Sequence, residues 1–261
     1  MIPVLQAPRS LIALRLAAGL LFVGSAALVA AILRGAWAHP LVAVLLLAVI
    51  GGAISLRWWA QERVVRSLKA GDPSAVLEHW SGLASKIPNP ATTLPIMRAT
   101  ALAAFGRLDE ARQALASAER GPAWEAAAEH RLLVDVLVQT FEGETAEARA
   151  AAARLATFPL PEADRTRARL SSMRESVASL ARAFAHQAMP GDVDRLERAA
   201  EESPLVHWAM RYGAAVAAID GGDLDRARRL VEGAPSWPAE SKFRSFHDEI
   251  GRIVGLAPRE A

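Results

Sequence analysis

Five glycines divide most of the chain into stretches that each have room for a pair of short helices. The intervals between them are 35, 37, 48 and 31 residues, and a run of helix-forming residues follows each glycine. The glycines are Gly71, Gly106, Gly143, Gly191 and Gly222. A recurrence of this length is typical of one helical unit repeated along a chain, and such units stack because none can bury its apolar face alone. The spacing therefore predicts an all-α array of about five helix pairs.

The residues after the glycines follow a shared pattern. Three segments show it best: GRLDEA at 106–111, GETAEA at 143–148 and GDLDRA at 222–227. A glycine tolerates the left-handed conformation that ends a helix, and an acidic residue then caps or begins the next helix. We expect the alanine five positions after each glycine to lie where two antiparallel helices cross, since its small side chain permits close approach. These alanines are Ala111, Ala148 and Ala227.

Apolar stripes with helical spacing support the same fold class. One follows i, i+3, i+7, i+10 and i+14 from residue 170, and another follows i, i+3, i+7 and i+10 from residue 243. Their members are Leu170, Met173, Val177, Leu180 and Phe184, and then Phe243, Phe246, Ile250 and Ile253. We expect the second stripe to form a capping helix. Residues 61–256 would then form the repeat domain, and residues 257–261 a disordered tail.

The glycine segments resemble the tetratricopeptide repeat (TPR) family. The family's inter-helix glycine matches Gly106, Gly143 and Gly222, and more loosely Gly71 and Gly191, and its second-helix alanine matches Ala111, Ala148 and Ala227. The resemblance covers about residues 57–238. It implies an α-solenoid of antiparallel helix pairs whose first helices line a concave groove. The interval of 48 residues departs from the family's spacing and predicts a long helix or an insertion in that unit.

The first 60 residues differ in character from the rest of the chain. They contain four arginines and no acidic residue. Residues 16–33 give 18 positions without a charge, and residues 35–56 give a further 22. A helix of about 20 apolar residues crosses the hydrocarbon core of a bilayer. The pattern predicts a transmembrane hairpin of two spans over residues 1–60.

The positions of the arginines predict the orientation of this hairpin. Arg9 and Arg15 precede the first span and Arg57 follows the second, whereas the turn between the spans contains only Arg34. Because basic loops remain inside, both ends and the repeat domain are expected on the cytoplasmic side of a bacterial inner membrane. An alternative is a signal peptide cleaved at residues 36–38, which read Ala-Trp-Ala. The second span would still leave the membrane toward its basic flank, so the domain is cytoplasmic under both interpretations.

The order of these parts also resembles, more loosely, the inner-membrane TPR proteins associated with bacterial haem biosynthesis. The stretch from Arg57 to Trp80 carries this second resemblance. Neither resemblance brings a catalytic motif with it. We expect an adaptor that docks a protein partner on its helical repeats. The alternative is a structural subunit of a membrane complex in which the hairpin makes the specific contacts.

Aromatic and arginine side chains are the candidate contacts to a protein partner, because these types dominate the energetics of interfaces. Trp208, Arg211 and Tyr212 fall on the first helix of one unit, Trp124 and Arg131 hold comparable places in another, and Arg165 and Arg169 share a helix face at i, i+4. Two alternatives stay open. The tryptophans can be core residues, and the arginines of residues 165–169 can pair with Glu162, Asp164 and Glu175.

No catalytic, cofactor or metal site is predicted. The chain has no cysteine, its six histidines lack a pair at helical spacing, and it has no glycine-rich phosphate loop. The triplet His247-Asp248-Glu249 points in three directions on a helix, so it does not converge on a metal ion. After residue 60, 26 basic residues face 28 acidic ones, which is not the basic footprint of a nucleic-acid-binding protein. The expected partners are a protein and the membrane, without a small-molecule substrate.

Overall fold

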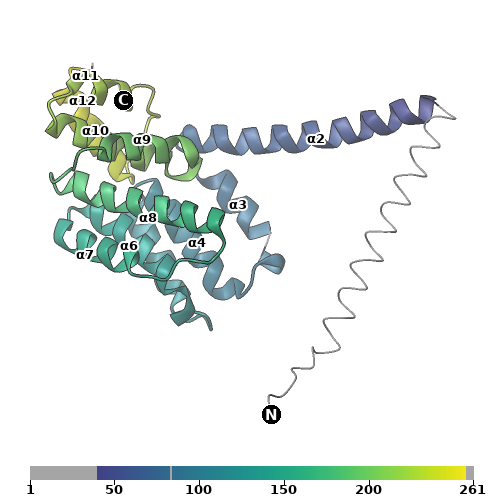
Figure 1. The fold of residues 1–261 in the computed structure, drawn as a ribbon, viewed down its shortest axis with the longest axis horizontal. Coiled ribbons are helices and arrows are strands. Elements are labelled where there is room, and N and C mark those ends of the chain that lie inside the picture. Colours follow the sequence, from purple (N-terminus) through teal and green to yellow (C-terminus); the bar gives the residue numbers. More distant parts are fainter. Residues whose placement is uncertain (1–39, 83, 257–261) are drawn as a thin grey trace, which may run out of the picture. The chain divides into compact units, whose positions relative to one another are not determined.

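The computed structural model describes residues 40–82 and 84–256, and every regular element in them is a helix (Figure 1). The α-helices are α2 (Pro40–Lys69), α3 (Ser74–Gly82), α4 (Pro90–Ala104), α5 (Leu108–Ala118), α6 (Ala128–Glu142), α7 (Thr145–Ala156), α8 (Asp164–Phe184), α9 (Asp192–Glu202), α10 (His207–Asp220), α11 (Leu224–Val231) and α12 (Lys242–Ile253). Short 3₁₀ turns lie at Ala84–Lys86, Glu125–Ala127 and Pro204–Val206. The all-α prediction is confirmed for this part of the chain.

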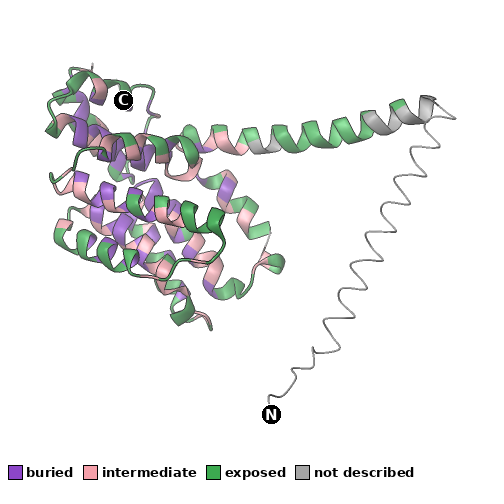
Figure 2. Cartoon of the chain, in the orientation of Figure 1, coloured by how far each residue is buried: buried purple, intermediate pink, exposed green. Residues whose placement is uncertain are grey.

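Residues 1–62 and residues 63–261 form two separate units. In the first unit, the large apolar side chains of α2 that the structure describes are exposed, as the green stretch of this helix in Figure 2 shows. They are Val44, Val49, Ile50, Ile54, Leu56, Trp58 and Trp59. No helix in the described residues is both long enough and apolar enough to cross a membrane. The predicted span over 16–33, the first part of the span over 35–56 and the tail at 257–261 lie outside the described residues.

The second unit is built from helical hairpins. α4 packs against α5, α6 against α7, α9 against α8 and α10, and α10 against α11. The predicted glycines separate consecutive helices, and all of them have positive φ angles, between +70° and +87°. They are Gly71, Gly106, Gly143, Gly191 and Gly222. The glycine spacing therefore located the turns correctly.

The interval of 48 residues is explained by one long helix. α8 has 21 residues, whereas α6 and α10 have 15 and 14. The segment before α8, residues 157–163, adds to the length of this unit. The apolar stripe predicted from residue 170 lies on α8, where Val177 and Leu180 are buried. Of the two forms expected for the irregular interval, a long helix or an insertion, the structure shows a long helix.

Small residues form the crossing points of the hairpins. Ala111, Ala148 and Ala227 all have no exposed surface, as predicted for the alanine of the second helix. The first helices of successive hairpins also contact each other, α4 with α6, α6 with α8 and α8 with α10. In Figure 2 the buried residues gather on these four helices, where they face their neighbours. Close helix packing through alanine therefore produces one continuous core.

The segment between α11 and α12 connects the end of the chain to its first hairpin. Lys242 N donates a hydrogen bond to Gly106 O at 2.9 Å, and Ser241 Oγ donates one to Phe105 O at 2.7 Å. The rings of Phe105 and Trp237 meet edge to face with their centroids 6.3 Å apart. These contacts join residues about 135 positions apart in the chain. The last helix is therefore part of the core as well as a cap.

Phe243 lies at the centre of an aromatic cluster that draws on several helices. It has no exposed surface, and its ring centroid lies 5.0 Å from that of Phe141 in α6 and 5.1 Å from those of Tyr212 and Trp237. The members of this aromatic cluster are Phe105, Phe141, Phe184, Trp208, Tyr212, Trp237, Phe243 and Phe246. Edge-to-face ring pairs stabilise a core beyond the area that they bury.

The turn at Gly106 provides a direct test of this closure. A Cβ atom on Gly106 would lie 2.9 Å from Ser241 Oγ and 3.1 Å from Phe243 N, in addition to the strain of a φ of +70°. At Gly222, with a φ of +80°, a Cβ atom would meet nothing within 4 Å. We expect Gly222→Ala to lower the free energy of unfolding by about 1 kcal/mol through backbone strain alone. Gly106→Ala should lower it by about 2 kcal/mol, because overpacking adds to the strain.

Urea unfolding of the full chain in detergent micelles measures both losses. Because the two turns have similar φ angles, the difference between the variants reports the contact with the C-terminal segment. Equal losses for Gly106→Ala and Gly222→Ala would contradict the packing of residues 241–243 on the α4–α5 turn.

Candidate functional site

Trp208 and Tyr212 are core residues, which selects the core alternative left open for Trp208 and corrects the expectation that Tyr212 contacts a partner. Trp208 is 5% exposed and Tyr212 has no exposed surface. Trp208 Nε1 donates to Lys69 O at 2.8 Å, and Trp237 Nε1 donates to Tyr212 Oη at 2.6 Å. Both side chains thus belong to the aromatic cluster, and a partner cannot reach them while the domain is folded. The prediction erred because the C-terminal segment covers the surface on which these residues were expected to lie.

The guanidinium of Arg211 donates hydrogen bonds to the C-terminal carbonyls of the neighbouring helix α11. Its Nε donates to Leu230 O at 2.5 Å and its Nη2 donates to Arg229 O at 2.7 Å, both in the last turn of α11. The last carbonyls of a helix lack partners within the helix and carry partial negative charge, so a guanidinium stabilises them. The guanidinium also lies 5.2 Å from the centre of the Trp208 ring. This arginine is therefore a structural cap on α11.

Arg165 and Arg169 lie on the first two turns of α8, and both are exposed. In the part of the chain that the structure describes, neither forms an ion pair with a carboxylate. Glu175, one of the acids that the sequence offered as an ion-pair partner for these arginines, pairs with another residue: its Oε2 lies 3.5 Å from Arg195 Nε. These two guanidiniums remain available at the surface.

Trp124 and Arg131 do lie together, as a cation–π pair. Trp124 lies in the turn before α6, Arg131 lies within α6, and the guanidinium carbon is 4.1 Å from the centre of the indole ring. Arg131 Nη2 is also 3.6 Å from Glu125 Oε2. The indole ring is half-buried against the core. Among the predicted contacts to a partner, Arg211 borders one cavity, of about 350 Å³, and Trp124 borders another, between α5 and α6.

That cavity, the α5–α6 cleft, has a volume of about 380 Å³. It is lined by Arg112, Leu115, Ala116 and Glu119 of α5, by Trp124, and by Asp135, Val138 and Gln139 of α6. Apolar side chains and a small number of polar groups line it together. A mixed lining of this kind is typical of sites that bind a ligand in a defined orientation.

Two acceptor groups in the α5–α6 cleft lack partners. The Asp135 carboxylate makes no hydrogen bond or ion pair among the described residues, and burial raises its pKa above the ordinary value even though Arg131, Arg154 and Arg112 oppose the shift. Gln139 Oε1 is buried without a hydrogen-bond donor. A buried acceptor that stays unsatisfied, as Gln139 Oε1 does, is rare in native proteins and is costly to leave unpaired, whereas the carboxylate of Asp135 is half-buried. The polar lining of the cleft is thus incomplete within the described chain.

A pattern of polar residues in the sequence of α6 indicates the α5–α6 cleft, although sequence analysis did not identify it. Arg131, Asp135 and Gln139 follow each other at i, i+4 and i+8, so they form a polar stripe on α6. The other positions of the same helix, such as Val134 and Leu137, are apolar and buried. A polar stripe on a helix with so many core residues indicates a lined cleft, but only the packing of α5 shows where it lies.

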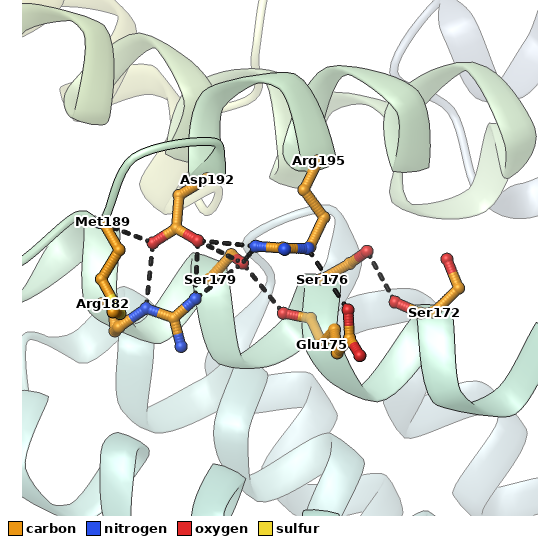
Figure 3. A network of polar contacts seen from close by, with 8 residues as sticks. All are labelled: Ser172, Glu175, Ser176, Ser179, Arg182, Met189, Asp192 and Arg195. Carbon is orange, nitrogen blue, oxygen red and sulfur yellow. Dashed lines mark hydrogen bonds and ion pairs between the residues drawn. The ribbon is translucent and has the colours of Figure 1, made fainter.

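A buried aspartate, Asp192, joins α8 to α9, as Figure 3 shows. Its side chain has no exposed surface. Oδ1 accepts hydrogen bonds from Arg182 Nη2 at 2.6 Å, Arg195 Nη1 at 2.8 Å and Ser179 Oγ at 2.9 Å. Oδ2 accepts from Arg182 Nε and from the backbone nitrogen of Met189, both at 2.9 Å.

These hydrogen bonds settle the role of the Asp192 network. Burial alone would raise the pKa of Asp192, but the bonds from Arg182, Met189 and Ser179 outweigh it and lower the pKa to about 2. A carboxylate whose oxygens already accept five hydrogen bonds, and whose pKa is this low, is poorly suited to accept a proton from a substrate. The network is a clamp between two helices, and sequence analysis missed it because Asp192 resembles an ordinary first-turn acid.

The histidines show no sign of a metal centre in the part of the chain that is described. No group of three His, Asp or Glu side chains lies close enough there to hold an ion. His247 lies with its Nδ1 3.3 Å from Tyr212 Oη, at the edge of the aromatic cluster.

Comparison of the chain with protein-family models, curated proteins and solved structures finds no match. The resemblances to the TPR family and to inner-membrane proteins of haem biosynthesis therefore have no support beyond the residues that suggested them. The structural features that bear on function are the α5–α6 cleft and the exposed apolar side chains of α2.

Proposed function

We propose that this protein is a membrane-anchored adaptor that docks a protein partner in the α5–α6 cleft at the cytoplasmic face of the bacterial inner membrane. The observation that carries this proposal is the cleft itself. Trp124, which packs on Arg131, lines it together with two acceptors of α6, Asp135 and Gln139, that have no hydrogen-bond donor in the described chain. Aromatic and charged groups held on rigid elements are the usual anchors of protein interfaces.

The packing of the helices supports a TPR-like solenoid as the scaffold. The first helices of successive hairpins contact each other in chain order, and each second helix also contacts the first helix of the next hairpin. Contact between neighbouring hairpins is a property of solenoids, although the C-terminal segment of this domain also packs on the first hairpin. The aromatic cluster around Phe243 fills the surface that a TPR protein would use, and the proposal therefore places the partner in the cleft.

The membrane anchor is the part of the proposal that rests on the sequence. The described helices do not meet the length and hydropathy of a span. The support comes from the uncharged stretches at 16–33 and 35–56 and from the basic residues that follow α2's apolar part. The side chains of Val49, Ile54 and Leu56 are each about two thirds exposed. Such exposure agrees with a helix whose apolar side chains contact lipid or another protein. An anchor raises the effective concentration of the domain for a partner in the same membrane.

Affinity purification from detergent-solubilised membranes tests the adaptor proposal. Trp124→Ala with Arg131→Glu removes the aromatic wall of the cleft and reverses the charge of the arginine that packs on it, and the partner captured by the wild-type chain should be lost. Arg165→Glu with Arg169→Glu is a matched control on α8, with two surface charges reversed away from the cleft, and it should retain the partner. Thermal unfolding of each variant confirms that the fold is kept. An unchanged set of captured proteins for the cleft variant would contradict the proposal.

A structural subunit of a membrane complex is the second candidate, and the exposed apolar side chains of α2 favour it. Exposed apolar residues in this number need a lipid or a protein to cover them. Replacing residues 1–60 with an unrelated two-span anchor separates the two roles. An adaptor should keep its partner after this exchange, whereas a subunit that assembles through its own hairpin should lose it.

A further inference from the structure

We infer that the α5–α6 cleft binds an arginine side chain presented by the protein partner, with Asp135 and Gln139 as its acceptors. This inference rests on the proposed adaptor function and adds the chemistry of what the cleft recognises. Asp135 and Gln139 lie one helical turn apart, so their side chains are neighbours on the surface of α6. Neither acceptor has a donor within the described chain.

The arginines of the chain itself do not fill this role. Arg112 is ion-paired with Glu142, and Arg131 lies over Trp124 and near Glu125. Arg154 of α7 is a third cation whose charge acts on the Asp135 carboxylate, but it makes no hydrogen bond or ion pair with that carboxylate in the described chain. A half-buried carboxylate is stabilised most by a cation that also donates hydrogen bonds to it.

The shape and lining of the cleft favour a guanidinium over other donors. Its volume of about 380 Å³ lies near the small end of the range for ligand sites, and it suits one long side chain. The planar guanidinium carries five N–H donors in a fixed fork, which lets it serve a carboxylate and an amide oxygen together. Leu115 and Val138 supply apolar surface along which the methylene groups of an arginine can pack.

Fluorine NMR on the full chain in detergent micelles tests the inference directly. The protein is labelled with 5-fluorotryptophan, and Trp124→Phe identifies the resonance of Trp124 among those of the seven tryptophans. The probe is the peptide acetyl-Gly-Gly-Arg-Gly-Gly-amide. Its comparison peptide carries citrulline, which keeps the size of the side chain and removes its charge. The arginine peptide should shift the Trp124 resonance in a saturable way, and the citrulline peptide should bind at least about tenfold more weakly.

Substitutions locate the site. Asp135→Asn should weaken the arginine peptide about tenfold, since it removes the charge and leaves the cleft intact. The control is Asp225→Asn, on α11, which makes the same change of side chain at an exposed aspartate in another hairpin. It should bind the peptide as the wild type does. Equal shifts with both peptides, or undiminished binding by Asp135→Asn, would overturn the inference.

The same variants separate this inference from the adaptor proposal. If the wild-type chain captures a partner from membranes and Asp135→Asn captures it equally well, the arginine site is wrong and the adaptor role stands. If the wild-type chain captures no more than the anchor alone, the adaptor role is wrong whatever the peptide titration shows.

Discussion

Phe243→Ala is expected to lower the free energy of unfolding by about 4 kcal/mol, the largest effect of any single change considered for this domain. The ring has no exposed surface and meets Phe141, Tyr212 and Trp237 with centroids 5.0 to 5.1 Å away. Alanine would leave a cavity between α6, α10 and α12 that these rigid rings cannot fill. The loss of three edge-to-face or tilted ring pairs adds to the cost of the cavity.

Urea unfolding of the full chain in detergent micelles measures the loss, and Ile253→Ala on the same helix is the control. Ile253 is 48% exposed, so its truncation should cost less than about 1 kcal/mol. A loss of similar size for both variants would show that α12 is a peripheral cap. The position of Phe243 in the core would then be wrong.

The elements of this fold were predictable because local chemistry determines them. Gly106, Gly143 and Gly222 end helices because the left-handed conformation is strained for other residues, and this holds whatever surrounds them. Ala111 and Ala148 are buried because a crossing of two helices needs a small side chain. These rules act over a few residues, so a single sequence reveals them.

The closure of the domain was not predictable in the same way. Ser241 contacts Phe105, and Trp208 contacts Lys69, across more than 130 positions in the chain. No spacing in the sequence records which distant turn will receive the C-terminal segment. Trp208 and Tyr212 have the residue types of an interface, and only the placement of Phe243 shows that they are core.

The candidate site likewise contains some residues that the sequence predicted and others that only the packing of the helices reveals. Trp124 and Arg131 were each predicted as contacts to a partner from their residue types, and the structure brings the two side chains together. Asp135 and Gln139 were missed, because an acid and an amide on a helix are most often solvated. Their significance comes from the absence of a hydrogen bond to either side chain in the described chain, which is a property of the packed state alone.

Asp192→Asn is expected to lower the free energy of unfolding by about 3 kcal/mol at neutral pH. Asparagine keeps the shape of the side chain but removes the charge that Arg182 and Arg195 face, and it places an NH₂ donor where an oxygen accepted hydrogen bonds. Asp109→Asn, in the first turn of α5, is the matched control because it tests the effect of the helix dipole without a buried network. Its cost should stay below about 1 kcal/mol.

The pH dependence of that loss identifies its cause. The pKa of Asp192 is lowered to about 2 in the folded protein from an ordinary value of 3.8, so unfolding raises its proton affinity. The carboxylate therefore contributes stability above about pH 4, and this contribution disappears as the pH falls toward 2. A shift of this size corresponds to about 2 kcal/mol. The difference between wild type and Asp192→Asn should narrow by this amount between pH 5 and pH 2 in urea titrations. A constant difference over that range would mean that the variant loses packing, and that the charge of Asp192 does not hold α8 to α9.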